Sequence, residues 1–212
     1  MRTIKVGSYS PITALATAYA TAVTSTGAAL TLVATAPTDG LGHLTTLTSP
    51  GANDLRGVTF TIVGTDADGK VQTEALAGAN SSSTVTGVKY FRTVTSVTPS
   101  ATMGGLTTDI GIGAVSIAPT VILERRSIAG ATMAVDISGT IDFTVSECFD
   151  NAFSVVNPSS LTFFPLAALT AKTADTIAVG TVAASAIQFK VNSVTNTATY
   201  TMYVSQATQQ TG

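Results

Sequence analysis

The chain lacks most of the side chains on which enzymes rely. Its 212 residues include one cysteine, one histidine and no tryptophan. The lone Cys148 excludes a disulfide within the chain and a metal site with two thiolates. With His43 as the only imidazole, few groups remain for acid-base or nucleophilic work, so we expect no enzyme, no bound metal and no cofactor.

Charge is also scarce. Charged residues form 10% of the chain, whereas soluble domains carry roughly 25%. The 10 lysine and arginine residues are scattered, and Arg125-Arg126 is their only adjacent pair. Because phosphate neutralisation needs a clustered basic face, we expect no nucleic-acid partner. So few charges favour a protein that is packed into a large assembly.

Long apolar runs are missing too. Residues 14–36 carry no charge, but threonine, serine and glycine interrupt them repeatedly. A spanning helix needs ~20 predominantly apolar residues, so we expect no membrane span and instead two strands joined by a turn at residues 24–27. The N-terminus does not show the apolar core of a secretory signal, which favours synthesis in the cytoplasm.

The chain does have regular alternation. Apolar Val58, Phe60 and Ile62 alternate with threonines, which is the period of a strand with one buried face. Residues 64–69 then supply glycines and aspartates for a reversal, so the pattern predicts a β-hairpin. Asp66 begins a segment like a calcium loop, but glycine and glutamate are not at the required spacing. We therefore interpret it as a turn.

These features predict an all-β protein of two small antiparallel β-sandwich or barrel-like domains in tandem. An extended N-terminal arm or first strand is expected over residues 1–20, the first domain over 21–123 and the second over 124–212. The boundary falls at the charged cluster Glu124-Arg125-Arg126. One long sandwich with an extension is the alternative.

Three further segments show the same alternation. Residues 90–98 predict one strand, and residues 187–204 predict a terminal hairpin. Residues 133–145 predict another hairpin, with Asp136 and Asp142 on its solvent face. That placement does not hold the two carboxylates across a cleft, as glycosidase chemistry requires.

The two rare reactive residues are expected to be inert. His43 is predicted to lie in a loop without a special role, because no nucleophile motif of the G-x-S-x-G type accompanies it. Glu147 and Asp150 flank Cys148, and their charges disfavour the thiolate and so raise the thiol pKa. We expect Cys148 to be a small buried hydrophobe.

The apolar run at residues 161–166 has two interpretations. It is either a core segment or an anchor for a partner, since aromatic residues concentrate at interfaces. The N-terminal arm is the second candidate contact element. The candidate interface residues are Phe163, Phe164, Pro165, Leu166, Tyr9 and Pro11.

Several phrases of the sequence resemble a known family. They are GVTFTIVGTDADG at residues 57–69, EALAGAN at 74–80, YFRTVTSVT at 90–98 and AIQFKV at 186–191. They are similar to short virion proteins of tailed bacteriophages that are encoded near the capsid genes. The resemblance implies a structural protein that decorates or cements the capsid by binding the major capsid protein, as a symmetric oligomer such as a trimer. It also implies a place on the virion exterior after synthesis in the host cytoplasm.

Two other roles stay open at this point. A tail tube, hub or fibre-base component is the first. The second is a module that binds host-surface glycans through the loops at residues 49–53 and 78–83. We expect no small-molecule substrate for the capsid or tail role.

Overall fold

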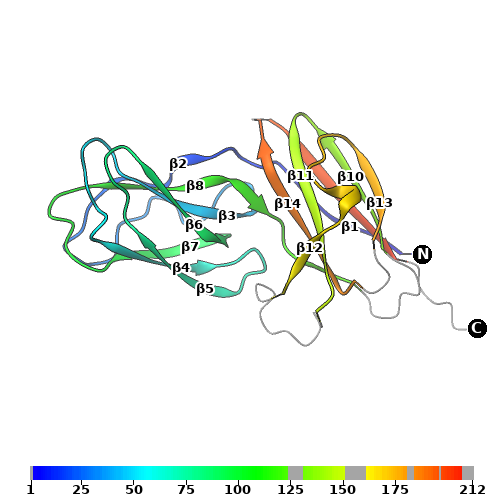
Figure 1. Cartoon of the computed structure of the whole chain (residues 1–212), viewed down its shortest axis with the longest axis horizontal. Helices are drawn as coiled ribbons and strands as arrows, with labels where there is room; N and C mark the ends of the chain where they lie inside the picture. Colours follow the sequence, from blue (N-terminus) through cyan, green and yellow to red (C-terminus); the bar gives the residue numbers. More distant parts are fainter. Residues whose placement is uncertain (1, 124–130, 151–160, 181–183, 196, 207–212) are drawn as a thin grey trace, which may run out of the picture. The chain divides into compact units, whose positions relative to one another are not determined.

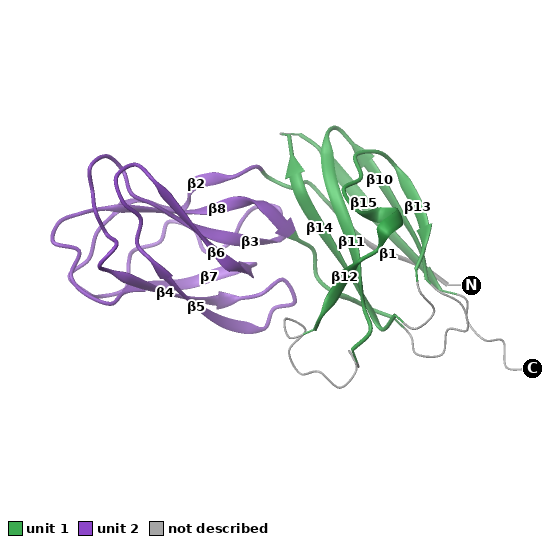
Figure 2. Ribbon diagram, in the orientation of Figure 1, with its two compact units in different colours: residues 1–12, 117–212 green, residues 13–116 purple. Residues whose placement is uncertain are grey.

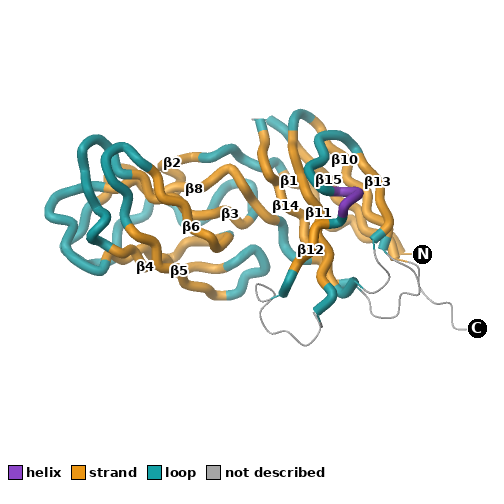
Figure 3. Tube along the Cα trace, in the orientation of Figure 1, coloured by secondary structure: helices purple, strands orange, loops and turns teal. Residues whose placement is uncertain are grey.

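The structure consists almost entirely of β-strands. It is a computed structural model that describes residues 2–123, 131–150, 161–180, 184–195 and 197–206 (Figure 1). Within those ranges the one helical element is a short 3-10 turn, η2 (Ala167–Leu169), and all else is strand or loop (Figure 3). The all-β prediction is confirmed, in keeping with the many β-branched threonines that suit pleated strands.

The chain folds into two compact units (Figure 2). Unit 1 comprises residues 1–12 and 117–212, and unit 2 comprises residues 13–116. Unit 2 is therefore an insertion in the sequence of unit 1, whereas the expected boundaries at residues 20 and 123 describe two domains in tandem. No local pattern signals this arrangement, because it depends on strands from opposite ends of the chain.

The pairing that closes unit 1 joins its first and last strands. β1 (Arg2–Tyr9) runs antiparallel to β15 (Thr199–Gln206), with a register shift between Lys5 and Gly7. Residues 2–9 are thus the edge strand of a sheet. The structure therefore agrees with the expectation that these residues form a first strand. It does not agree with the expectation of an extended arm.

Unit 1 contains two antiparallel sheets. The first has the strand order β1–β15–β10–β13, and the second includes the run β12–β11–β14, with the short β9 also paired to β14. The remaining bounds are β9 (Val121–Ile122), β10 (Thr132–Ser138), β11 (Ile141–Cys148), β12 (Phe163–Pro165), β13 (Thr176–Val179) and β14 (Ala186–Val194).

The two hairpins predicted in this half are wrong. β10 and β11 belong to different sheets, and so do β14 and β15. Gly139 turns the chain between β10 and β11 with φ of +89°, and a Cβ there would lie 2.9 Å from Cα of Ala198. Asp136 and Asp142 consequently lie on different sheets. A period of two is the same whether strands bond side by side or face each other across a core, so alternation could not separate the two cases.

A column of four aromatic rings connects the two sheets of unit 1. Tyr9 on β1 lies 5.3 Å from Tyr200 on β15, measured between ring centroids. Tyr200 stacks on Phe189 of β14 at 4.1 Å, and Phe189 stacks on Phe143 of β11 at 5.2 Å. The last three rings are at most 1% exposed. Each contact of this kind stabilises by about 0.5–1.5 kcal/mol beyond the burial of its area.

Unit 2 is likewise built from two sheets. One includes the run β8–β3–β6, with β2 also paired to β8, and the other has the order β5–β4–β7. The bounds are β2 (Leu15–Val23), β3 (Gly42–Thr48), β4 (Thr59–Thr65), β5 (Val71–Ala77), β6 (Thr84–Phe91), β7 (Thr93–Pro99) and β8 (Thr108–Ile117).

The hairpin predicted from the first phrase of the sequence is confirmed. β4 and β5 pair without interruption from Thr59 opposite Ala77 to Thr65 opposite Val71. In the turn, Oδ1 of Asp66 accepts the backbone N–H groups of Asp68 (3.0 Å) and Lys70 (2.8 Å). Gly69 adopts a φ of +79°. The acidic side chain therefore organises the backbone of the turn, as this turn chemistry requires.

Two other strand predictions in this unit need correction. Residues 90–98 are not one strand, because the chain passes from β6 in one sheet to β7 in the other at Arg92. Residues 28–36 form no regular strand after β2. They run irregularly along β7 instead, where Leu30 N–H donates to Val97 (2.8 Å) and Val94 N–H donates to Thr35 (2.8 Å).

The aromatic column predicts a large effect of removing its central ring. Tyr200→Ala is expected to lower the free energy of unfolding by about 3–5 kcal/mol, because it leaves a cavity between two sheets. Tyr203→Ala is the matched control on the opposite, half-buried face of the same strand, and it is expected to cost about 1 kcal/mol or less. Urea denaturation measures both. Equal losses in the two variants would contradict the role given to the column.

Candidate functional site

The predicted contact run at residues 161–166 is divided by the structure. Leu161 is buried with Cys148 and Ala186, and Phe163 packs against that cluster. Phe164 points the other way and is 54% exposed. Pro165 is exposed and Leu166 is half-buried. Part of the run therefore belongs to the core and part to the surface, because successive side chains of β12 point to opposite faces of the sheet.

The exposed ring of Phe164 has an aromatic neighbour that the sequence did not reveal. Phe149, which follows β11, lies 6.0 Å from Phe164 between ring centroids and is 46% exposed. β12 pairs with β11 at the edge of its sheet, with Phe164 opposite Glu147. We call Phe149 and Phe164 the aromatic pair. The sequence offered one signal for the exposure of Phe149. If Cys148 is buried, the alternation of the strand directs the next side chain outward.

The two candidate residues of the N-terminal segment serve the interior. Tyr9 is half-buried against Tyr200, and Pro11 is buried. A side chain on Gly7 would overlap the Tyr9 ring, so the glycine leaves room for this contact. Neither residue offers a free surface comparable to that of the aromatic pair.

Cys148 is buried, as predicted. The side chain has no exposed surface, and its Sγ lies 3.7 Å from Oδ2 of Asp150. Burial is the largest cause that raises the pKa of the thiol, and the charge of Asp150 adds to it. The thiolate, which is the nucleophile and the metal ligand, is therefore disfavoured.

The histidine is not in a loop, which corrects the sequence prediction. His43 lies in β3 with no exposed surface. Its Nε2 is 2.8 Å from Oδ2 of Asp39, and its Nδ1 is 3.2 Å from the carbonyl oxygen of Gly113. The pair also affects Tyr19, whose pKa is raised by burial and further by the charge of Asp39. With both ring nitrogens engaged, this imidazole has none left for a substrate.

Glu74 is a second buried acid with a structural task. It lies on β5 and its Oε1 accepts the backbone N–H groups of Val88 (2.6 Å) and Lys89 (3.2 Å) on β6. Nearby, Nε2 of Gln72 donates to the carbonyl of Tyr90 (2.5 Å). These bonds join edge strands of two different sheets. A Cβ at Gly87 would overlap Oε2 of Glu74, so the contact requires a glycine there.

The two loops considered for glycan binding do come together. Ser49 N–H donates to the carbonyl of Ser83 (3.0 Å), and Ser81 N–H donates to that of Asn53 (2.7 Å). The hydroxyl of Ser82 donates to the carbonyl of Gly51 (3.1 Å). The polar groups in these bonds are therefore used between the two loops and are not available to a ligand.

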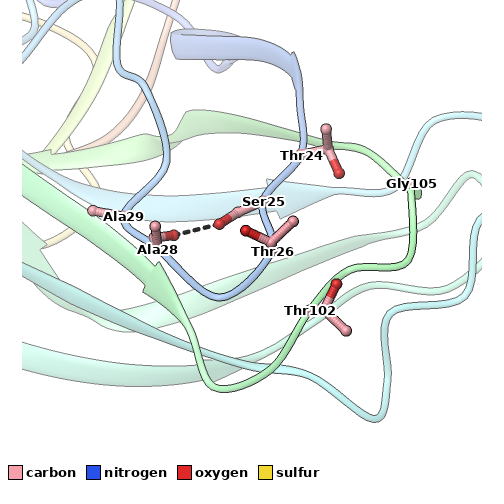
Figure 4. Close-up of a pocket in the computed structure, with 7 residues that line it drawn as sticks. All are labelled: Thr24, Ser25, Thr26, Ala28, Ala29, Thr102 and Gly105. Atoms are coloured by element: carbon pink, nitrogen blue, oxygen red, sulfur yellow. Dashed lines mark hydrogen bonds between the residues drawn. The ribbon is translucent and has the colours of Figure 1, made fainter.

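Two shallow hollows lie on unit 2, and both have neutral walls. In the first, of about 430 Å³, Ser25 donates its hydroxyl to the carbonyl of Ala28 (2.5 Å) (Figure 4). The second has a volume of about 420 Å³. Hydroxyl and methyl groups line both, so neither offers an acid, a base or an anion-binding charge. The walls of the first are Thr24, Ser25, Thr26, Ala28, Ala29, Thr102 and Gly105, and those of the second include Thr46, Thr48, Thr84 and Thr86.

The buried pair of Asp39 and His43 predicts a stability effect. His43→Ala is expected to lower the free energy of unfolding by about 3–5 kcal/mol, because it leaves a buried carboxyl without its partner. Arg56→Ala is the control, since it breaks an ion pair with Asp54 whose side chains are 67% and 48% exposed. That variant is expected to melt at the wild-type temperature. An unchanged melting temperature for His43→Ala would contradict the structural role.

The contact between Glu74 and Gly87 predicts a second effect. Gly87→Ala is expected to destabilise unit 2 by about 1–3 kcal/mol, because the methyl group overlaps a buried carboxylate. The loss should be smaller in a Glu74→Ala background. Gly57→Ala is the control, since nothing lies within 4 Å of a Cβ at that position. Thermal denaturation of the four variants gives the comparison, and an equal loss in both backgrounds would argue against the contact.

Within the described ranges, no three His, Cys, Asp or Glu side chains gather closely enough to hold a metal ion. No helix of the described residues has the length and apolarity needed to span a bilayer. Comparison of the chain with protein-family models, with curated proteins and with solved structures finds no match.

Proposed function

We propose that this protein is a non-enzymatic structural component of a tailed-phage virion, which decorates or cements the capsid by binding the major capsid protein. The observation that carries the proposal is the aromatic pair, two neighbouring rings exposed at the edge of a sheet. The motif resemblance of the sequence supplies the identity of the partner.

The aromatic pair suits a protein contact for energetic reasons. Phe149 and Phe164 leave about half of each ring in water, and burial stabilises by roughly 25 cal/mol per Å² of apolar surface. Aromatic anchors of this kind commonly provide a large part of the binding energy of an interface. In a shell under pressure from packaged DNA, such an added interface resists the separation of neighbouring capsid subunits.

The use of the ionisable residues supports a structural role. Asp66 and Glu74 accept backbone N–H groups, and His43 is bonded at both nitrogens. Catalysis needs titratable groups that reach a substrate, and these groups instead hold the chain in place. The scarcity of charge fits a surface that is covered by neighbours in an assembly. Self-association and a location on the virion exterior belong to the same proposal.

One observation favours a second candidate, a module that binds host-surface glycans. The loops at residues 49–53 and 78–83 meet at one place, with Ala52, Ser81 and Ser82 exposed. Binding of the purified protein on a glycan array would support this function. A role in the tail is distinguished from the capsid role by cryo-electron microscopy of the particle, which shows where the protein lies.

The capsid proposal predicts a loss of shell binding when the aromatic pair is broken. Phe164→Ala is expected to weaken binding to empty capsids by roughly 30-fold, which corresponds to about 2 kcal/mol. Val88→Ala is the control, because that side chain is 82% exposed on unit 2. Co-sedimentation with shells measures the binding. If wild-type protein does not sediment with shells, or if Phe164→Ala binds equally well, the proposal fails.

A further inference from the structure

We propose that strand β13 is a self-association edge, at which two copies of this chain pair antiparallel about a two-fold axis. β13 is the last strand of the sheet β1–β15–β10–β13. On its outer face, Ile177 is 73% exposed and Val179 is 66% exposed. They are the two most exposed large apolar side chains of the described part of unit 1.

Among the described strands, β13 pairs on one side only, with β10. Gly180 N–H donates to the carbonyl of Ala131 (2.8 Å), in line with the β10–β13 register. Opposed residues of an antiparallel pair alternate between bonded and non-bonded positions, so this bond fixes which residues face β10. Ile177 and Val179 therefore direct their N–H and C=O groups away from β10 and towards the free edge.

Other edges of unit 1 are protected against such pairing. β1 is interrupted by a register shift between Lys5 and Gly7. β12 has three residues and contains Pro165, which has no N–H to donate. Charges, bulges and prolines are the usual means by which proteins protect sheet edges. β13 has none of them, and its register with β10 is continuous.

The edges of unit 2 are protected as well. Residues 30–35 cover β7 through hydrogen bonds to Val97 and Val94. Side chains of β5 bind the backbone of β6, with Glu74 at the centre. β2 pairs with β8 through two register shifts. Within the part of the chain that the structure describes, β13 therefore combines an edge without a second strand partner and two exposed apolar side chains.

A second copy of the same strand is the occupant that fits this edge. A two-fold axis midway between the two opposed Ala178 residues places Ile177 of each copy opposite Val179 of the other. Those are the positions with outward backbone groups, so each opposed pair exchanges two hydrogen bonds. The contact is isologous, as in most symmetric dimers. The two sheets then join into one continuous sheet.

Charge does not oppose the pairing. The four residues of β13 are uncharged. The nearest acid in the sequence, Asp175, turns towards its own sheet, where its Oδ1 accepts the N–H of Ile137 (2.8 Å). No like charges of β13 therefore meet across the axis. The inference concerns a dimer, which differs from the trimer that the motif resemblance implies.

Sedimentation velocity of the full chain over a range of concentrations tests the dimer. The wild type is expected to shift reversibly from monomer to dimer. Ile177→Lys and Val179→Lys are each expected to weaken association by at least about tenfold, because an apolar contact is lost and like charges approach across the axis. Val33→Lys is the control, with the same change at a side chain 79% exposed on unit 2.

Cysteine pairs test the register. Chains with Ile177→Cys mixed with chains with Val179→Cys are expected to form disulfide-linked dimers under mild oxidation. Each variant alone is the matched control, because its two cysteines lie on the diagonal, roughly 7–8 Å apart between Cα atoms and outside ordinary disulfide reach. The native Cys148 is buried and does not compete.

Several results would overturn the inference: a wild type that stays monomeric or forms trimers, lysine variants that associate unchanged, or either cysteine variant linking to itself faster than the mixture does. The inference is independent of the capsid role. Phe164→Ala is expected to dimerise like the wild type, so a failure of shell binding and a failure of self-association are separate results.

Discussion

The contact on which unit 1 depends is the stack of Phe189 on Tyr200, 4.1 Å apart across the two sheets. Phe189 and Tyr200 belong to strands of different sheets, which share no backbone hydrogen bonds. The ring contact therefore joins the two sheets. Tyr9 and Phe143 extend the stack to β1 and β11. Residues from both ends of the chain are thereby held in one core, and the insertion of unit 2 between β1 and residue 117 leaves that core closed.

Several acidic residues in the described part of the chain organise its own interior. Asp66 shapes a turn, Glu74 joins two edge strands, and Asp39 pairs with a buried His43. Each carboxylate is stabilised by donors that would otherwise lack partners, which suits buried acids in a low-dielectric interior. Exposed charges do occur, as at Arg56 and Asp54, but charged residues form only 10% of the chain. A surface of this kind presents hydroxyl groups and apolar area with comparatively little charge.

Unit 1 has two exposed apolar surfaces, and each lies at the last strand of one of its sheets. The aromatic pair lies where β12 closes one sheet, and Ile177 and Val179 lie where β13 closes the other. In both places an inward-facing side chain is followed along the strand by an exposed apolar one. Sheet edges and the side chains beside them are natural places for contacts, because their backbone groups and apolar area are still available. The proposed capsid contact and the proposed self-association edge use these two separate surfaces.

The sequence by itself determined the all-β class, the buried faces and the β4–β5 hairpin. Alternation marks the inward residues, as at Phe60 and Phe189, and the turn from Asp66 to Gly69 depends on neighbours in the chain. The tertiary structure alone decided that β14 and β15 face each other, that β1 joins β15, and that His43 is buried with Asp39. Those arrangements join segments distant in sequence or reverse the local expectation. The alternation within a strand shows which of its faces is apolar. It does not show which other strand packs against that face.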